Sequence, residues 1–184
     1  MKNKLLSSLL LLLSFNVSAS TLSNLVKNEI SPIIVVDKSA AKMFVYFPQD
    51  GTVLSGPVLL GKVKGDHINL ADFNINTNSP AITPAGTFWA NKKFSAKLNE
   101  SILSFVEGHI SFIAIHPVFT KIPAERRLQR LTSSETYDNR ISNGCINLGL
   151  EFFNVIYAML PSRSKLIILP ESDSVIDDIS ASPL

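Results

Sequence analysis

Cysteine is almost absent from this 184-residue chain, and no apolar run is long enough to cross a membrane. Cys145 is the single cysteine, so no internal disulfide can form. The longest apolar stretch, residues 5–13, is far shorter than the roughly 20 residues that a membrane helix needs. These two absences argue against a disulfide-stabilised domain and against a membrane-spanning helix.

Clustered metal ligands and a strong charge are also missing. The three histidines, His67, His109 and His116, are dispersed and do not have zinc-ligand spacing, so neither a metal nor another cofactor is expected. The chain has 17 basic and 15 acidic residues, and no basic run alternates with aromatic residues. Nucleic acid is therefore not an expected partner.

The N-terminus has the pattern of a secretory signal peptide. Met1-Lys2-Asn3-Lys4 precedes the apolar stretch, and the small residues Ser18 and Ala19 follow it. We expect cleavage after Ala19, which removes Lys2 and Lys4 and leaves equal numbers of basic and acidic residues. Because no cysteine lies near that point, a lipid anchor is not expected. The prediction is an exported protein of the periplasm or cell envelope.

The rest of the chain is predicted to form one mostly β domain over residues 33–170. A short N-terminal segment, residues 20–32, precedes it, and an acidic flexible tail, residues 171–184, follows it. Asp50-Gly51 predicts a hairpin turn, and residues 65–81 resemble a surface loop. β-Branched and alternating patterns predict strands at residues 33–37, 42–47, 53–60, 86–91, 102–107, 111–116 and 166–169. Helices are predicted from Pro123 to Leu131 and from Leu150 to Leu160, the latter with an apolar stripe of Leu150, Phe153, Ile156, Tyr157 and Leu160.

Cys145 lies in the polar, turn-prone sequence Ile141-Ser142-Asn143-Gly144-Cys145-Ile146-Asn147. A free cysteine is often an inert core residue, but this setting is a poor one for a core thiol. Successive backbone N–H groups in such a turn can stabilise a thiolate and the oxyanion formed when it attacks an amide. Cys145 is therefore predicted to be a nucleophile.

His116 is the candidate base, because it ends the apolar strand Phe112-Ile113-Ala114-Ile115 at a sheet edge. A structural hydrogen bond is the alternative role for a histidine in this position. His67 and His109 lie in polar or tight turns, where solvent exposure is expected, and neither is assigned a role.

These segments together resemble the L,D-transpeptidase catalytic domain, also called the YkuD-like domain. The family pattern, a histidine at a strand end followed later by Ser/Thr-His-Gly-Cys, an apolar residue and Asn or Arg, matches His116 and the motif from Ser142 to Asn147. Two further segments match: residues 34–37 with 43–46, and Thr83-Pro84-Ala85-Gly86-Thr87-Phe88. The resemblance spans roughly residues 33–169 and implies a β-sandwich or barrel-like domain with a few short helices.

The resemblance also implies residue roles. Cys145 is the nucleophile and His116 the base, the turn at Asn143 and Gly144 supplies backbone N–H groups for the oxyanion, and the Pro117 carbonyl orients the imidazole. Asn143 replaces the family's usual histidine, which its backbone role tolerates.

The interval between His116 and Cys145 is longer than usual in the family, which implies an inserted lid over residues 118–139. Leu128 and Leu131 are expected to face the domain. Four arginines are candidates for binding substrate carboxylates: Arg126, Arg127, Arg130 and Arg140. An alternative is a solvated helix face with no binding role.

The implied reaction is acyl transfer on peptidoglycan stem peptides. Cys145 attacks the carbonyl of the L-centre of diaminopimelate in a tetrapeptide, releases D-Ala and holds a thioester. An amine then resolves it, giving a 3→3 cross-link or attachment to an envelope protein, whereas water gives a carboxypeptidase or amidohydrolase. A non-catalytic wall-binding module stays open. A sortase-like enzyme using Arg163 lacks the matching motifs, and a papain-like enzyme has the opposite order of cysteine and histidine.

Overall fold

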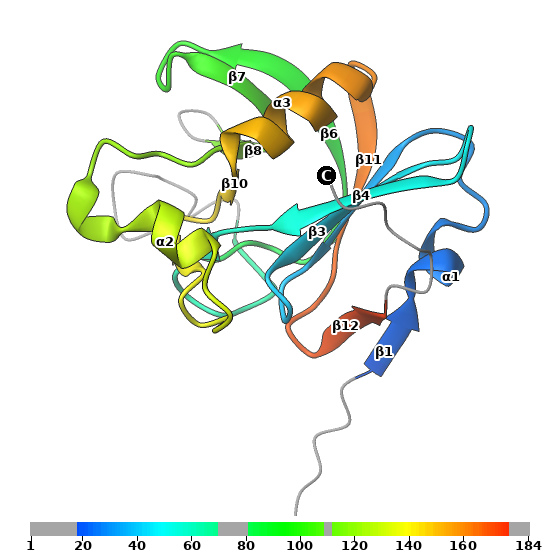
Figure 1. Ribbon diagram of the computed structural model, residues 1–184, viewed down its shortest axis with the longest axis horizontal. Helices are drawn as coiled ribbons and strands as arrows, with labels where there is room; N and C mark the ends of the chain where they lie inside the picture. The colour runs from blue at the N-terminus through cyan, green and yellow to red at the C-terminus, as the bar shows by residue number, and fades with distance from the viewer. Residues whose placement is uncertain (1–17, 70–80, 109–111, 177–184) are drawn as a thin grey trace, which may run out of the picture.

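An eight-stranded sheet dominates the computed structural model, which describes residues 18–69, 81–108 and 112–176. Along the sheet the strands follow the order β10-β8-β7-β6-β11-β2-β3-β4 (Figure 1). Their bounds are β2 Ile33–Asp37, β3 Lys42–Phe47, β4 Thr52–Pro57, β6 Gly86–Ser95, β7 Glu100–Glu107, β8 Phe112–Pro117, β10 Ile146–Leu148 and β11 Arg163–Ile168. The predicted mostly β fold is confirmed, as is the β3–β4 hairpin at Asp50-Gly51, where Gly51 has a φ of 74°.

The two ends of this sheet meet, so the sheet is nearly a closed barrel. Leu59, just after β4, exchanges two backbone hydrogen bonds of 2.9 Å with Asn147 on β10. Beside this bridge, the short strands β5 (Leu60–Gly61) and β9 (Arg140–Ser142) pair in parallel. Closure places the Asn147 end of the cysteine motif within the barrel wall.

The strand β2 is buried on both faces, which explains its uninterrupted apolar sequence. Ile34 and Val36 belong to the main core inside the barrel. Ile33 and Val35 pack outward in a second cluster with Leu22 of α1 (Leu22–Val26). The short helix α1 therefore covers the outer face of the sheet at β2 and β3.

The helix α3 (Leu150–Met159) supplies the main core with three residues, Phe153, Ile156 and Leu160. Leu150 was predicted on the same stripe, but it is 61% exposed because it is the first residue of the helix, which enters the core only from Phe153. A Cβ on Gly56 of β4 would lie 2.9 Å from the Phe152 ring, so this helix and strand pack closely.

The predicted helix from Pro123 to Leu131 is not continuous. A 3₁₀ turn, η1 (Pro123–Glu125), and the helix α2 (Arg127–Leu131) are separated by Arg126, whose φ of 49° is left-handed. Leu131 is buried as expected, but Leu128 is 57% exposed, because the break turns it away from the domain.

The prediction of a flexible tail starting at Glu171 is wrong for its first residues. Glu171 is held by ion pairs, and β12 (Asp173–Ile176) pairs in parallel with β1 (Ser18–Thr21). Their side-chain and sheet contacts come from distant parts of the chain, which a local composition cannot reveal. The rest of the predicted tail and residues 1–17 of the predicted signal peptide lie outside the described residues. Within the described ranges, the helices are all too short or too polar to cross a membrane.

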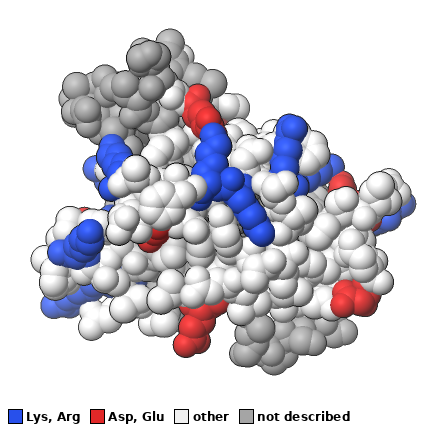
Figure 2. Space-filling model, turned by 90° about the horizontal axis from the view of Figure 1, so that it is seen from above, with Lys and Arg blue, Asp and Glu red and all other residues white. Residues whose placement is uncertain are grey.

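Charged side chains are spread over the surface in separate groups. On the face seen in Figure 2, basic groups are divided by wide uncharged areas and are interspersed with acidic residues. That face therefore has no continuous basic stripe of the kind that follows a nucleic-acid backbone.

Candidate active site

Cys145 lies in the turn between β9 and β10, partly exposed and packed against the main core. Gly144, just before it, has a φ of 112°, a conformation that strongly favours glycine. A Cβ at Gly144 would also come within 2.8 Å of the Ile82 carbonyl oxygen. The Gly-Cys sequence is thus required both by the backbone conformation and by the close approach of a second segment.

Two buried hydroxyls hold this turn. Ser142 Oγ accepts the Gly144 N–H at 3.1 Å and donates to the Cys145 carbonyl at 2.5 Å. Thr83 Oγ1 donates to the Gly144 carbonyl at 3.0 Å and accepts the Gly61 N–H at 2.8 Å. The motif at Ser142 and the segment at Thr83, which are far apart in the sequence, therefore meet at the same turn.

His116 reaches the site because β8 and β10 pair in parallel, with His116 opposite Asn147. The side chain is only 5% exposed. Its Nδ1 lies 2.8 Å from the Pro117 carbonyl oxygen and 3.1 Å from Glu100 Oε1. Its Nε2 lies 3.0 Å from Asn147 Nδ2.

The environment of His116 favours the charged ring. Burial opposes the charge, but hydrogen bonds and charge interactions with Cys145 and Glu100 raise the pKa of His116 to about 9. The thiol of Cys145 and the imidazole of His116 therefore form one interacting pair.

Three of the four candidate arginines are bonded within the chain. Arg127 donates to Glu125 Oε2 at 2.6 Å and to Asn147 Oδ1 at 2.8 Å. Arg130 donates to the backbone carbonyls of Glu125 and Asp138 at 2.9 and 3.1 Å. Arg126 is exposed, and no hydrogen bond or ion pair joins it to another side chain in the described part of the protein.

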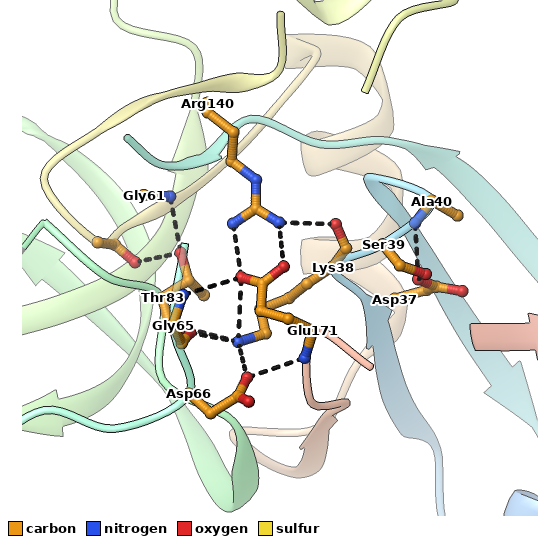
Figure 3. Close-up of polar contacts among 11 residues, drawn as sticks. Asp37, Lys38, Ser39, Ala40, Gly61, Gly65, Asp66, Thr83, Arg140 and Glu171 are labelled. Atoms are coloured by element: carbon orange, nitrogen blue, oxygen red, sulfur yellow. Dashed lines mark hydrogen bonds and ion pairs between the residues drawn. The ribbon is translucent and has the colours of Figure 1, made fainter. Parts of the chain in front are cut away.

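Arg140 belongs to a buried charge cluster close to the turn (Figure 3). It forms a bidentate pair with Glu171, at 2.9 and 2.6 Å, and donates to the Lys38 carbonyl at 2.9 Å. The fully buried Lys38 ammonium lies 2.6 Å from Asp66 and donates to the Thr83 carbonyl at 3.1 Å. Arg140 is thus tied to the segment that supports the turn.

A groove lies along the insert between His116 and Cys145. Its volume is about 620 Å³, and Ile122 and Leu128 line it together with Arg126 and Arg127. Since Phe119, only three residues after His116, also lines it, the groove begins close to the candidate base. It combines an apolar wall with an unpaired cation.

Sequence reasoning assigned no role to Glu100, which contacts His116 from the first residue of β7. A single carboxylate at a strand start has no distinguishing local pattern. It also gave no partner for Asn147 beyond the motif, although Asn147 contacts both His116 and Arg127. Both contacts depend on strand pairing and on the fold of the insert.

Residues 31–168, most of the chain, match the family model described as the L,D-transpeptidase catalytic domain. The chain belongs to this family. Family membership connects the protein with peptidoglycan and implies an extracytoplasmic location. No curated protein matches the chain.

Solved L,D-transpeptidase structures are similar at low identity. The L,D-transpeptidase from Stackebrandtia nassauensis is 15% identical, with a TM-score of 0.43 and coverage of 77% of this chain and 56% of its own. The L,D-transpeptidase from Mycobacterium smegmatis is 17% identical, with a TM-score of 0.45 and coverages of 76% and 58%. The catalytic domain from the E. faecium enzyme is 19% identical, with a TM-score of 0.44 and coverages of 76% and 97%. This L,D-transpeptidase-family chain therefore spans under three fifths of the length of the first two proteins.

Proposed function

We propose that the protein is an exported L,D-transpeptidase that uses Cys145 as nucleophile and His116 as base. The observation that carries this proposal is the interaction of the Cys145 thiol with a buried imidazole whose opposite nitrogen is held by the Pro117 carbonyl. A nucleophile, a base and a group that orients the base are the minimum set for thiol acyl transfer.

In the first half-reaction, Cys145 Sγ bonds to the carbonyl carbon of the L-centre of diaminopimelate in a tetrapeptide stem. His116 takes the thiol proton and passes it to the departing amine as the bond to D-Ala breaks. The product is a thioester on Cys145. Because Pro117 and Glu100 occupy the Nδ1 side of the ring, Nε2 is the nitrogen that moves the proton.

The oxyanion is stabilised by the backbone of the turn at Asn143, Gly144 and Cys145. The Gly144 N–H is already bonded to Ser142 Oγ, so Gly144 contributes mainly through its conformation. The N–H groups of Asn143 and Cys145 have no backbone partner in the described part of the chain, which supports them as the donors.

In the second half-reaction, an amine attacks the thioester and transfers its proton to His116. A diaminopimelate side chain gives a 3→3 cross-link, an amine of an envelope protein gives a protein–peptidoglycan link, and water gives hydrolysis. The groove at Arg126 is a suitable acceptor site, since stem peptides carry carboxylates and the groove starts beside His116.

Incubation of the purified protein with disaccharide-tetrapeptides, followed by mass spectrometry of the products, tests this proposal. We expect release of D-Ala together with 3→3 cross-linked dimers, and neither product with Cys145→Ala. Tripeptide without dimer would assign the hydrolytic activity instead. Product formation that is equal with Cys145→Ala would contradict the cysteine mechanism, and no product with either protein would favour a wall-binding module.

A further inference from the structure

Asn147 connects the insert to the candidate base. Its Oδ1 accepts a hydrogen bond from Arg127 at 2.8 Å, and its Nδ2 lies 3.0 Å from His116 Nε2. Asn147 is fully buried in β10, and a salt bridge to Glu125 at 2.6 Å fixes Arg127. Glu125, Arg127, Asn147 and His116 thus form a continuous chain of polar contacts.

The guanidinium determines the orientation of this amide. Arginine has only N–H donors, so the Asn147 atom that faces Arg127 must be the oxygen. The NH₂ group then faces His116 and can only donate, so Nε2 must offer its lone pair. In this arrangement the ring proton is on Nδ1, where the Pro117 carbonyl accepts it.

We infer that Arg127 is a positioning residue: by holding Asn147 it selects the form of His116 in which Nε2 is unprotonated. When Nε2 gains a proton during the reaction, two N–H donors face each other. An amide flip would relieve this conflict at His116 but would turn the NH₂ group toward the Arg127 guanidinium. The imidazolium is therefore destabilised and passes its proton on to the leaving amine more readily.

This effect opposes that of the other groups around the ring. Glu100 of β7 and Cys145 favour the imidazolium, whereas Arg127 and Asn147 favour the neutral ring. The remaining charged residue of β7, Glu107, is bonded to Lys93 and Ser104. The helix α3 also packs near β8, but its titratable residues, Glu151 and Tyr157, do not contact His116 within the described structure.

In the acyl-enzyme, Cys145 is a thioester and cannot form a thiolate, so its influence on His116 disappears. The contacts of Asn147 and Arg127 then count for more, and they keep the base neutral for attack by the acceptor. This use of the contacts in catalysis rests on the proposed function. The selection of the ring's protonation form does not, and it can be measured without turnover.

The test is an NMR titration of His116 in the Cys145→Ala protein, which removes the thiol as the acyl-enzyme does. The resonances of His116 are assigned by their loss in His116→Gln. We expect ¹⁵N shifts of the neutral ring to show a proton on Nδ1 and none on Nε2. We expect Arg127→Met to raise the pKa of His116 by about one unit, a tenfold change in proton affinity. Arg127→Lys should restore most of the original value, because lysine keeps a donor to Asn147.

Arg130→Met is the matched control, because Arg130 holds the same insert but does not contact Asn147. It should leave the His116 titration unchanged. A double-mutant cycle with Asn147→Leu separates amide orientation from plain charge. If the amide transmits the effect, Arg127→Met changes the pKa little once Asn147 is replaced.

An equal shift with and without Asn147 would overturn the inference in favour of a direct charge effect. A neutral ring protonated on Nε2 would also overturn it, and that measurement needs no substitution at Arg127, so it stands even if Arg127→Met does not fold. Neither result would touch the proposed acyl transfer by Cys145.

Discussion

At the residue scale, the conformation of the cysteine turn depends on one glycine and two hydroxyls. Gly144 has the left-handed conformation, and Ser142 and Thr83 bond the groups on either side of it. Cys145 is therefore presented by a backbone that is fixed before any substrate binds, as a preorganised oxyanion site requires.

We predict that Gly144→Ala destabilises the protein by about 1–3 kcal/mol and removes activity, because a Cβ there is strained and meets the Ile82 carbonyl. Gly149→Ala is the control, since its Cβ would have ordinary contact with Leu131 at 3.7 Å and its φ is −56°. Urea unfolding and turnover are measured for both variants. Equal stability of the two would contradict the strained-turn interpretation.

The raised pKa of His116 predicts a pH-dependent stability. Burial opposes the charged ring, but Cys145 and Glu100 raise its pKa to about 9, above the ordinary 6.5. The extra stability is complete below pH 6.5 and is lost as the pH rises toward 9.

Glu100→Gln should lower the folded-state pKa of His116 and reduce this loss, on the order of 1 kcal/mol. Unfolding free energies of both proteins at pH 6 and pH 9 give the comparison. The same pH dependence in both would show that Glu100 does not act on the ring.

At the element scale, strong periodic patterns were sufficient to predict most strands and α3, whereas weak or distant signals were not. The pattern of β2 was explicit because both of its faces are buried. In contrast, β9, β10 and β12 have only three or four residues each, too few for a period to be recognised. The break at Arg126 was not predictable, because an arginine has no preference for the left-handed conformation it adopts.

The candidate site shows the same division. Cys145, His116 and the contact with Pro117 follow from short local motifs. Glu100 and the partners of Asn147 depend on how β7, β8, β10 and the insert assemble, which no local motif encodes. The four candidate arginines had equivalent sequence settings, and only their contacts in the fold distinguish Arg126.

For the insert, we predict that Arg126→Ala raises KM several-fold for the acceptor peptide with little change in stability. Arg126 has no described ion pair to lose, and it lines the groove beside the base. Arg130→Ala should instead lower the melting temperature, because it removes two hydrogen bonds that hold the insert. Unchanged KM with Arg126→Ala would leave a solvated face as the role of this segment.

On the scale of the whole molecule, the buried cluster of Figure 3 joins four distant segments. Lys38, Asp66, Arg140 and Glu171 come from the β2–β3 turn, the loop after β5, β9 and the segment after β11. Because Lys38 also bonds the Thr83 carbonyl, the cluster supports the segment that holds the cysteine turn.

We predict that Arg140→Ala costs about 3–5 kcal/mol of stability, since it leaves Glu171 and the Lys38 carbonyl without their main donor. Lys93→Ala is the control, because the Lys93–Glu107 pair is half exposed, with side-chain exposures of 47% and 50%. Such an exposed pair should contribute less than about 1 kcal/mol. Similar losses in the two variants, measured by chemical unfolding, would argue against a supporting role for the cluster.

The central proposal, that Cys145 is acylated by a stem peptide, can be measured directly by intact-protein mass spectrometry after rapid mixing with disaccharide-tetrapeptide. The expected species is the protein plus the substrate minus D-Ala, located on Cys145 by peptide mapping and absent from Cys145→Ala. D-Ala release without any adduct on a thiol shown to be free and reduced, or an adduct that persists in Cys145→Ala, would contradict it.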